Sequence, residues 1–94
     1  EGSEEKMITK TVTVINSQGF HMRPATVFAG EMGKFKSKIT LESGGHTVDG
    51  KSLMNIIAAC IKCGAEVKII CEGEDEKAAL DKAVSMIESG LGEE

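Results

Sequence analysis

Residues 8–32 read ITKTVTVINSQGFHMRPATVFAGEM, and the spacing of apolar side chains changes within this stretch. From Ile8 to Ile15 apolar and polar side chains alternate, which is typical of a half-buried β-strand. NSQG then ends the strand as a loop. After Pro24 the apolar side chains recur three and four residues apart, which indicates one face of a helix with proline in its first turn. The stretch therefore predicts a strand, a loop and a helix that begins at Pro24.

The rest of the chain continues this alternation of patterns. Residues 37–50 predict a β-hairpin in which SGGH forms the turn. A second helix is expected to begin with Ser52 as its N-cap and to end at Gly64. A strand over residues 65–72 and a third helix that ends at Gly90 complete the order β-α-β-β-α-β-α.

Four strands that each have one apolar face form a sheet whose apolar side must be buried against other elements. Three one-sided helices supply that cover and leave the other face of the sheet to water. The predicted fold class is α/β, in the form of a two-layer α+β sandwich with a four-stranded antiparallel sheet covered on one face by three helices. Residues 8–94 are expected to form one domain, and residues 1–7 to be a disordered N-terminal extension or a cloning remnant.

The composition argues against several classes of protein. The chain has 94 residues, a formal net charge of −4 and three aromatic side chains, which is unlike the basic, aromatic-rich surfaces that bind nucleic acids. The longest uncharged apolar run, residues 56–61, is too short for membrane insertion. The acidic EGSEEK start does not resemble a secretory leader. Three cysteines, an odd number, favour a reducing cytosol, so a cytoplasmic location is expected.

The stretch GFHMRPAT, residues 19–26, indicates phosphate chemistry. A helix that begins at Pro24 leaves His21 just outside its positive end, where backbone amides point outward and phosphate binds readily. Arg23 adds a cation with two donors for phosphate oxygens. Neutral imidazole can attack phosphorus and pass the group on. We therefore expect reversible phosphoryl transfer through His21, against the plainer interpretation of a surface or capping histidine. The expected backbone donors to the phosphate are the amides of Arg23, Ala25 and Thr26.

These residues carry a resemblance to a known family. GFHMRPAT, the later GKSLM and the segment GAEVKIICEGEDE together resemble HPr, the histidine-containing phosphocarrier family of the bacterial sugar phosphotransferase system, from about Ile8 onward. The resemblance implies an open-faced β-sandwich without a cofactor. It implies that enzyme I, with phosphoenolpyruvate as donor, phosphorylates the pros nitrogen of His21, which then passes the group to IIA domains of sugar permeases. Arg23 matches the active-site arginine of the family. The resemblance further implies that the chain is a phosphoryl carrier and not an enzyme. Gln18 stands where the family often has Ser, Asn or Thr, so the sequence does not determine which groups form hydrogen bonds around His21.

The resemblance also implies a second site at the start of the second helix. Ser52 matches the family's regulatory serine, which HPr kinase/phosphorylase modifies with ATP in many Gram-positive bacteria; its plain interpretation is an N-cap. We expect an exposed apolar patch around His21 that forms weak, transient contacts with partners, and a monomeric chain. The residues of this expected partner interface are Phe20, Arg23, Leu53, Met54 and Ile57.

Three alternative functions stay open. The domain can be a regulatory module whose Ser52-phosphate binds a transcriptional co-regulator in carbon catabolite repression, although His21 favours the carrier. It can instead be a phosphocarrier of a nitrogen-related branch. CIKC allows a thiol or metal protein that uses Cys60 and Cys63, because a C-x-x-C pair can be redox-active or bind metal. The default for Cys60 is burial on the apolar stripe of its helix. No metal site is expected, since zinc needs about four ligands and the only nearby ligand types are Cys71, His46 and acids.

Overall fold

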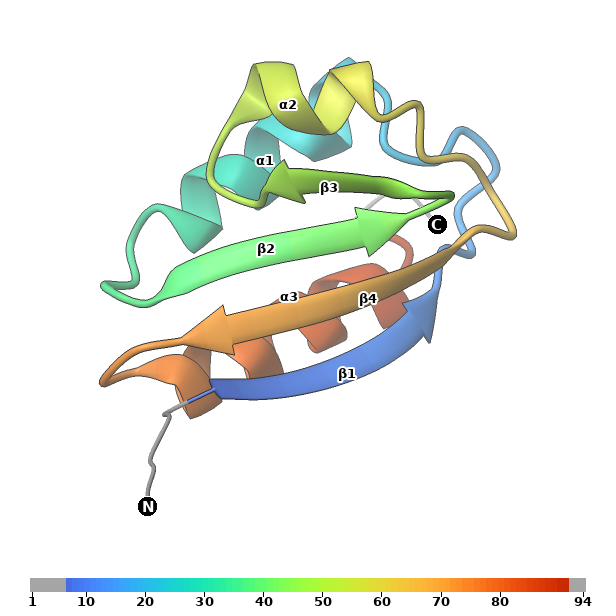
Figure 1. Ribbon diagram of the computed structural model, residues 1–94. Coiled ribbons are helices and arrows are strands. Elements are labelled where there is room, and N and C mark those ends of the chain that lie inside the picture. The colour runs from blue at the N-terminus through green and yellow to red at the C-terminus, as the bar shows by residue number, and fades with distance from the viewer. Residues whose placement is uncertain (1–6, 92–94) are drawn as a thin grey trace.

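The computed structural model describes residues 7–91, which form one sheet and three helices (Figure 1). The elements are β1 Met7–Thr13, α1 Met22–Met32, β2 Lys38–Ser43, β3 His46–Asp49, α2 Leu53–Ala58, β4 Glu66–Glu72 and α3 Glu76–Glu88. The strand order is β1-β4-β2-β3, and each neighbouring pair is antiparallel. The predicted fold class and element order are confirmed. Residues 1–6 of the expected extension lie outside the described residues, whereas Met7 is the first residue of β1 and pairs with Glu72.

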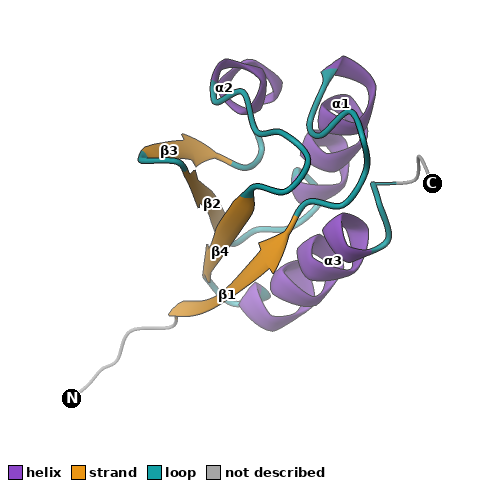
Figure 2. Cartoon of the chain, turned by 90° about the vertical axis from the view of Figure 1, so that its right-hand side faces the viewer, coloured by secondary structure: helices purple, strands orange, loops and turns teal. Residues whose placement is uncertain are grey.

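The sheet is covered on one side only, as the edge-on view in Figure 2 shows. Helix α3 packs against β1 and β4, α1 lies beside α3, and α2 contacts α1 and the edge strand β3. The alternation along β4 follows from this arrangement, because Val67, Ile69 and Cys71 are buried towards the helices while Lys68 is exposed. Within residues 7–91 no helix is both long enough and apolar enough to cross a membrane.

The buried apolar core lies between the sheet and the helices and fixes the direction of α1. Fully buried apolar side chains of this core include Phe28, Met32, Ile39, Leu41, Ile56, Ile69, Ile87, Val14 and Val67. Phe28 and Met32 come from α1, and each such burial contributes about 1.5–3 kcal/mol. The burial of these two side chains therefore fixes α1 in the core, and with it the N-terminus of α1, where the candidate site lies.

Two helix boundaries differ from the predicted ones. Helix α1 begins at Met22, two residues before Pro24, because proline fits any position of the first turn, where its missing amide is not needed. Helix α2 ends at Ala58 and not at Gly64. Cys60 adopts a left-handed backbone with φ of 53°, which stops the helix before the periodic apolar pattern does. Cys60 and Ile61, which the apolar spacing placed on the same helix as Leu53, Ile56 and Ile57, therefore lie outside α2.

Asp75, the N-cap of α3, ties the start of β2 to this helix. Its carboxylate accepts hydrogen bonds from the backbone amides of Lys36 and Ser37, each at 2.8 Å, and from the Ser37 hydroxyl. The hydroxyl of Ser37 and then the amide of Lys36 contribute most to lowering the pKa of Asp75 to about 2. Because hydrogen bonds stabilise the charged form, the carboxylate is held ionised in the folded protein.

This clamp predicts an acid-sensitive stability. The pKa of Asp75 is lower in the folded protein than in the unfolded chain. Its contribution to the free energy of unfolding is therefore complete above about pH 4 and is lost as the pH falls towards about 2. Asp75→Asn should therefore lower the melting temperature at pH 7 by several degrees and show a smaller loss of stability between those two pH values. Thermal unfolding from pH 2 to pH 7 measures both effects. Asp81→Asn, at an exposed position of α3, is the matched control; equal pH profiles for the two variants would contradict the clamp.

Candidate functional site

His21 is the N-cap residue of α1. Its backbone is extended, with φ of −82° and ψ of −173°, and its carbonyl accepts a hydrogen bond from the amide of Ala25 at 3.0 Å. The side chain is half-buried. His21 stands at the N-terminus of this eleven-residue helix, which is the positive end of the helix dipole. A negative charge carried by His21 is stabilised at this position.

The amides that can face a phosphoryl group lie nearer the N-terminus than expected. Ala25 already donates its amide to the carbonyl of His21, and Thr26 lies further inside α1, where its hydroxyl donates to the carbonyl of Met22 at 2.7 Å. With His21 as the N-cap, the amides of the first turn without a partner four residues earlier in the helix are those of Met22 and Arg23; Arg23 was among the expected donors, whereas Met22 was not. Arg23 is exposed.

The loop before His21 is organised by Asn16, which sequence reasoning missed. Asn16 is fully buried, and its side-chain amide donates to the carbonyl of Gly19 at 2.7 Å. The amide of Gly19 donates in turn to the carbonyl of Asn16 at 3.0 Å. Gln18, the position at which the sequence leaves the hydrogen bonds of the loop open, is exposed. Asparagine in NSQG is a known turn former, and this preference is the signal that could have identified it.

Gly19 packs against the backbone that follows α2. Its φ is +64°, and a Cβ at this position would lie 2.5 Å from the carbonyl oxygen of Ile61 and 2.7 Å from Cα of Lys62. Both the left-handed conformation and the close approach require glycine. The next amide, that of Phe20, donates to the same Ile61 carbonyl at 2.9 Å. Residues 61–62 therefore hold the two residues that precede His21.

Phe20 lies in the core and not on the surface. It is 3% exposed and packs edge-to-face on Phe28, with the ring centroids 5.2 Å apart. The expectation that Phe20 belongs to an exposed partner interface is therefore wrong, because a buried aromatic pair is stabilised by both area and ring geometry. The contact between the Phe20 ring and Phe28 therefore fixes the loop before His21 against α1.

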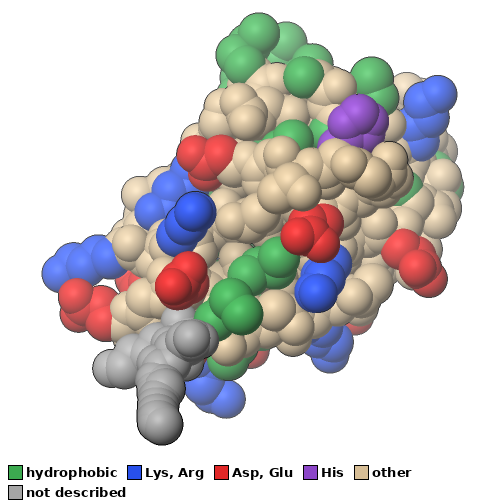
Figure 3. All heavy atoms as spheres, viewed as in Figure 1, with side chains coloured by type: hydrophobic (Ala, Val, Ile, Leu, Met, Phe, Trp, Pro, Cys, Tyr) green, Lys and Arg blue, Asp and Glu red, His purple; other side chains and the backbone are tan. Residues whose placement is uncertain are grey.

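Apolar surface is nevertheless exposed on α2, where hydrophobic side chains gather at the top of the molecule in Figure 3. Met54 is 69% exposed, while Leu53 and Ile57 are half-buried at the edge of the core. We call these three residues the α2 patch. Met22, directly after His21, is 57% exposed and was not predicted as a contact residue. Both helices thus present apolar side chains at their exposed ends, as partner-binding surfaces do.

Ser52 is the N-cap of α2, as predicted. Its hydroxyl oxygen accepts hydrogen bonds from the backbone amide of Asn55 at 3.3 Å and from the side-chain amide of Asn55 at 3.1 Å. The side chain is half-buried and immediately precedes the α2 patch. A charge added at Ser52 would therefore lie beside the apolar side chains of the α2 patch.

The three cysteines lie in different surroundings. Cys60 and Cys63 are exposed free thiols and Cys71 is buried. The expectation that Cys60 is buried is wrong, because α2 ends before it. Among residues 7–91 no cluster of three or more His, Cys, Asp or Glu side chains is placed to hold a metal ion.

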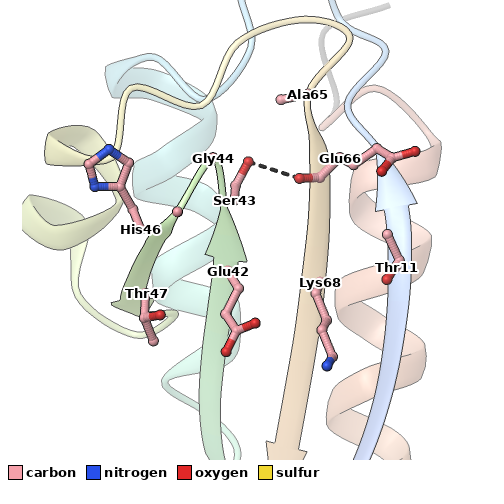
Figure 4. A pocket seen from close by; sticks show the side chains of 10 residues that line it. Thr11, Glu42, Ser43, Gly44, His46, Thr47, Ala65, Glu66 and Lys68 are labelled. Atoms are coloured by element: carbon pink, nitrogen blue, oxygen red, sulfur yellow. Dashed lines mark hydrogen bonds between the residues drawn. The ribbon is translucent and has the colours of Figure 1, made fainter.

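A pocket of about 680 Å³ lies on the open face of the sheet, away from the predicted site residues (Figure 4). Glu42 and Lys68 border it from neighbouring strands, and the hydroxyl of Ser43 donates to the carbonyl of Glu66 at 2.8 Å across it. His46 lies at its rim in the β2–β3 turn region. Since neither an arginine nor the N-terminus of a helix accompanies His46 among the residues that line this pocket, the candidate site is the N-terminus of α1.

The chain resembles known proteins in both sequence and structure. The model of the family "PTS HPr component phosphorylation site" matches residues 8–89. The chain is 38% identical over 88 residues to phosphocarrier protein HPr of Treponema pallidum (strain Nichols), covering 94% of this chain and 100% of that protein. It is 35% identical over 82 residues to HPr-like protein Crh of Bacillus subtilis (strain 168), covering 87% and 96%. The crystal structure of HPr-C-His from Thermoanaerobacter tengcongensis matches with a TM-score of 0.88 and 38% identity, over 93% and 98% of the two chains. The chain therefore belongs to the HPr family of phosphocarriers of the phosphotransferase system.

Proposed function

We propose that His21 accepts a phosphoryl group from phosphorylated enzyme I, with phosphoenolpyruvate as the original donor, and passes it to the IIA domains of sugar permeases. The observation that carries this proposal is the place of His21 as the N-cap of α1. A nucleophile at the positive end of a helix has a stabilising environment for the charge that it receives.

Transfer requires one bond to form and one to break at phosphorus. The pros nitrogen of His21, Nδ1, attacks with its lone pair, and the bond between phosphorus and the donor breaks. The amides of Met22 and Arg23 and the guanidinium of Arg23 stabilise the negative oxygens during transfer and afterwards. Because the two amides are held at the start of α1 before the reaction, they also serve the onward transfer, and no cofactor takes part in the proposed reaction.

The α2 patch and Met22 supply a docking surface in this proposal. Methionine side chains adapt to several partner surfaces, which suits a carrier that meets both a donor and a range of acceptors. A carrier must leave each partner quickly, so small transient interfaces are expected. We propose that the chain acts as a cytoplasmic monomer and that Met54, with 69% exposure, is its main apolar contact.

The test is phosphorylation by purified enzyme I. Incubation with phosphoenolpyruvate and enzyme I should add one phosphoryl group per chain, and acid should remove it, as phosphohistidine requires. Intact-mass measurement before and after acid treatment detects both. A chain that stays unmodified, with an enzyme I that phosphorylates a reference HPr in the same mixture, would refute the carrier function.

We also propose that ATP-dependent phosphorylation of Ser52 by HPr kinase/phosphorylase regulates the carrier and recruits a transcriptional co-regulator. Two observations support this second role: Ser52 immediately precedes the α2 patch, and the chain resembles HPr-like protein Crh as well as HPr. A phosphate at the N-cap keeps an acceptor for the amide of Asn55. Its charge therefore acts on docking partners while α2 stays folded.

A charge at Ser52 should slow phosphorylation of His21 by enzyme I. Ser52→Asp should lower the rate about tenfold, equivalent to about 1.4 kcal/mol, because a carboxylate beside the α2 patch must be desolvated or repelled during docking. Ser52→Asn is the matched control, since asparagine caps a helix as well as aspartate without charge. Initial rates with limiting enzyme I give the comparison. Similar rates for the two variants would show that charge at Ser52 does not act on docking.

A further inference from the structure

We infer that Cys60 and Cys63 form an oxidisable pair, and that closing them into a disulfide displaces the loop that carries His21 and slows its phosphorylation. The slowing rests on the proposed carrier function, whereas the displacement of the loop can be measured without it. Neither cysteine takes part in the site described above. The two are separated by the residues that hold the loop.

Oxidants reach two of the three thiols. Cys60 and Cys63 are exposed and free. Cys71 is fully buried on β4, and burial, together with the negative charges of Glu76 and Asp75, raises its pKa to about 11. Because the thiolate is the reactive form, Cys71 is protected at neutral pH and serves as an internal control.

The backbone between the two exposed cysteines is in tight contact with the loop. The Ile61 carbonyl accepts the amide of Phe20 at 2.9 Å. A Cβ on Gly19 would lie 2.5 Å from that carbonyl oxygen and 2.7 Å from Cα of Lys62, so no free space separates the two segments. A displacement of Ile61 and Lys62 towards Gly19 is therefore passed directly to the loop, two residues before His21.

Disulfide closure also changes the contact of Cys63 with the start of the loop. In the reduced protein the Cys63 thiol donates to the carbonyl of Ile15 at 3.7 Å. A disulfide requires a sulfur–sulfur distance of about 2.05 Å and removes this donor. It also closes a ring through Cys60, whose backbone has φ of 53°, and restricts the backbone of the two residues inside the ring. Oxidation thus acts on both ends of the segment from Ile15 to Gly19.

The chemistry needs a two-electron oxidant, and we assign a hydroperoxide. One cysteine thiolate attacks the peroxide oxygen, so that a sulfur–oxygen bond forms, the oxygen–oxygen bond breaks and hydroxide leaves. The second thiolate attacks the sulfenic sulfur, forms the sulfur–sulfur bond and expels a second hydroxide. Two thiols are oxidised and hydrogen peroxide is reduced to two molecules of water. A dithiol reductant reverses the change.

The first experiment follows the thiols and the loop without phosphoryl transfer. The reduced full chain is treated with hydrogen peroxide and measured by intact mass, and peptide mapping should show a Cys60–Cys63 disulfide with a free Cys71. Backbone amide NMR should then show shifted signals for Gly19 and Phe20 that return with dithiothreitol. Cys63→Ser should abolish both changes, and Cys71→Ala should keep them. A disulfide between two chains, irreversible sulfinic acids, or a closed pair with unmoved loop signals would each overturn the inference.

The second experiment measures phosphorylation of the oxidised and the reduced protein by enzyme I. We expect the oxidised chain to react about tenfold more slowly, because small misplacements of a reacting group carry large kinetic costs. Dithiothreitol should restore the rate, and oxidised Cys63→Ser should react like reduced wild type. If the oxidised chain with a mapped Cys60–Cys63 disulfide is phosphorylated as fast as the reduced chain, the inferred slowing is wrong. If the reduced chain is not phosphorylated at all while the loop signals still move, the carrier function fails and the displacement stands.

Discussion

His21→Ala should take up no phosphoryl group from phosphoenolpyruvate and enzyme I, whereas wild type takes up one per chain. The loss should be complete because the attacking nitrogen belongs to His21, and neither Arg23 nor the backbone amides of α1 can replace a nucleophile. His46→Ala is the matched control, since His46 is the other histidine of the chain and lies at the start of β3. Intact mass under neutral conditions, followed by acid treatment, measures the uptake.

A stability measurement on the same variants distinguishes the loss of the nucleophile from the loss of the folded structure. His21 is half-buried at a helix end, so His21→Ala should change the free energy of unfolding by no more than about 1 kcal/mol. Denaturant unfolding of both histidine variants checks this. Phosphate on a folded His21→Ala protein, or its loss from His46→Ala alone, would assign the carrier role to another residue.

Gly19→Ala should destabilise the protein by about 3 kcal/mol, because a methyl group there combines a left-handed backbone with overpacking against another backbone segment. The added Cβ would lie 2.5 Å from the carbonyl oxygen of Ile61, and neither partner is a flexible side chain that can move aside. The loop must shift to relieve this contact. Phosphorylation of His21 should therefore fall as well, even at temperatures at which the variant is fully folded.

Gly30→Ala provides the opposite outcome in the neighbouring helix. Gly30 lies in α1, and a methyl group added there would meet no atom within 4 Å outside the helix's own backbone, so alanine should raise the stability by up to about 1 kcal/mol. Urea unfolding of both variants and the rate of phosphorylation at low temperature give the comparison. If Gly19→Ala matched wild type in both measurements, residues 61–62 would not be what positions the loop.

Local patterns in the sequence predicted most of the architecture. The alternation of β4 and the helical spacing after Pro24 are properties of neighbouring residues, and they led to the correct element order and the one-sided cover. The N-cap role of Ser52 is equally local, because a hydroxyl that accepts an amide three residues later needs no tertiary partner.

What could not be predicted depends on contacts between distant segments. Phe20 stands in a loop by sequence, and only its packing on Phe28 places it in the core. The need for glycine at Gly19 arises from the backbone of Ile61 and Lys62, far along the chain. The end of α2 follows from the left-handed backbone at Cys60, since the apolar spacing continues past it. The chemistry that we propose for the site thus follows from GFHMRPAT, while the contacts that support the loop could not be predicted from it.

Reversible carriage of a phosphoryl group by His21 is tested most directly by a chase of the labelled protein. The chain is phosphorylated from labelled phosphoenolpyruvate, separated from enzyme I and mixed with an unlabelled IIA domain. The label should leave His21 and appear on the IIA domain in equal amount, and His21→Ala should carry none to begin with. Label that stays on the chain, or that is released as inorganic phosphate in the presence of the IIA domain, would contradict the carrier function.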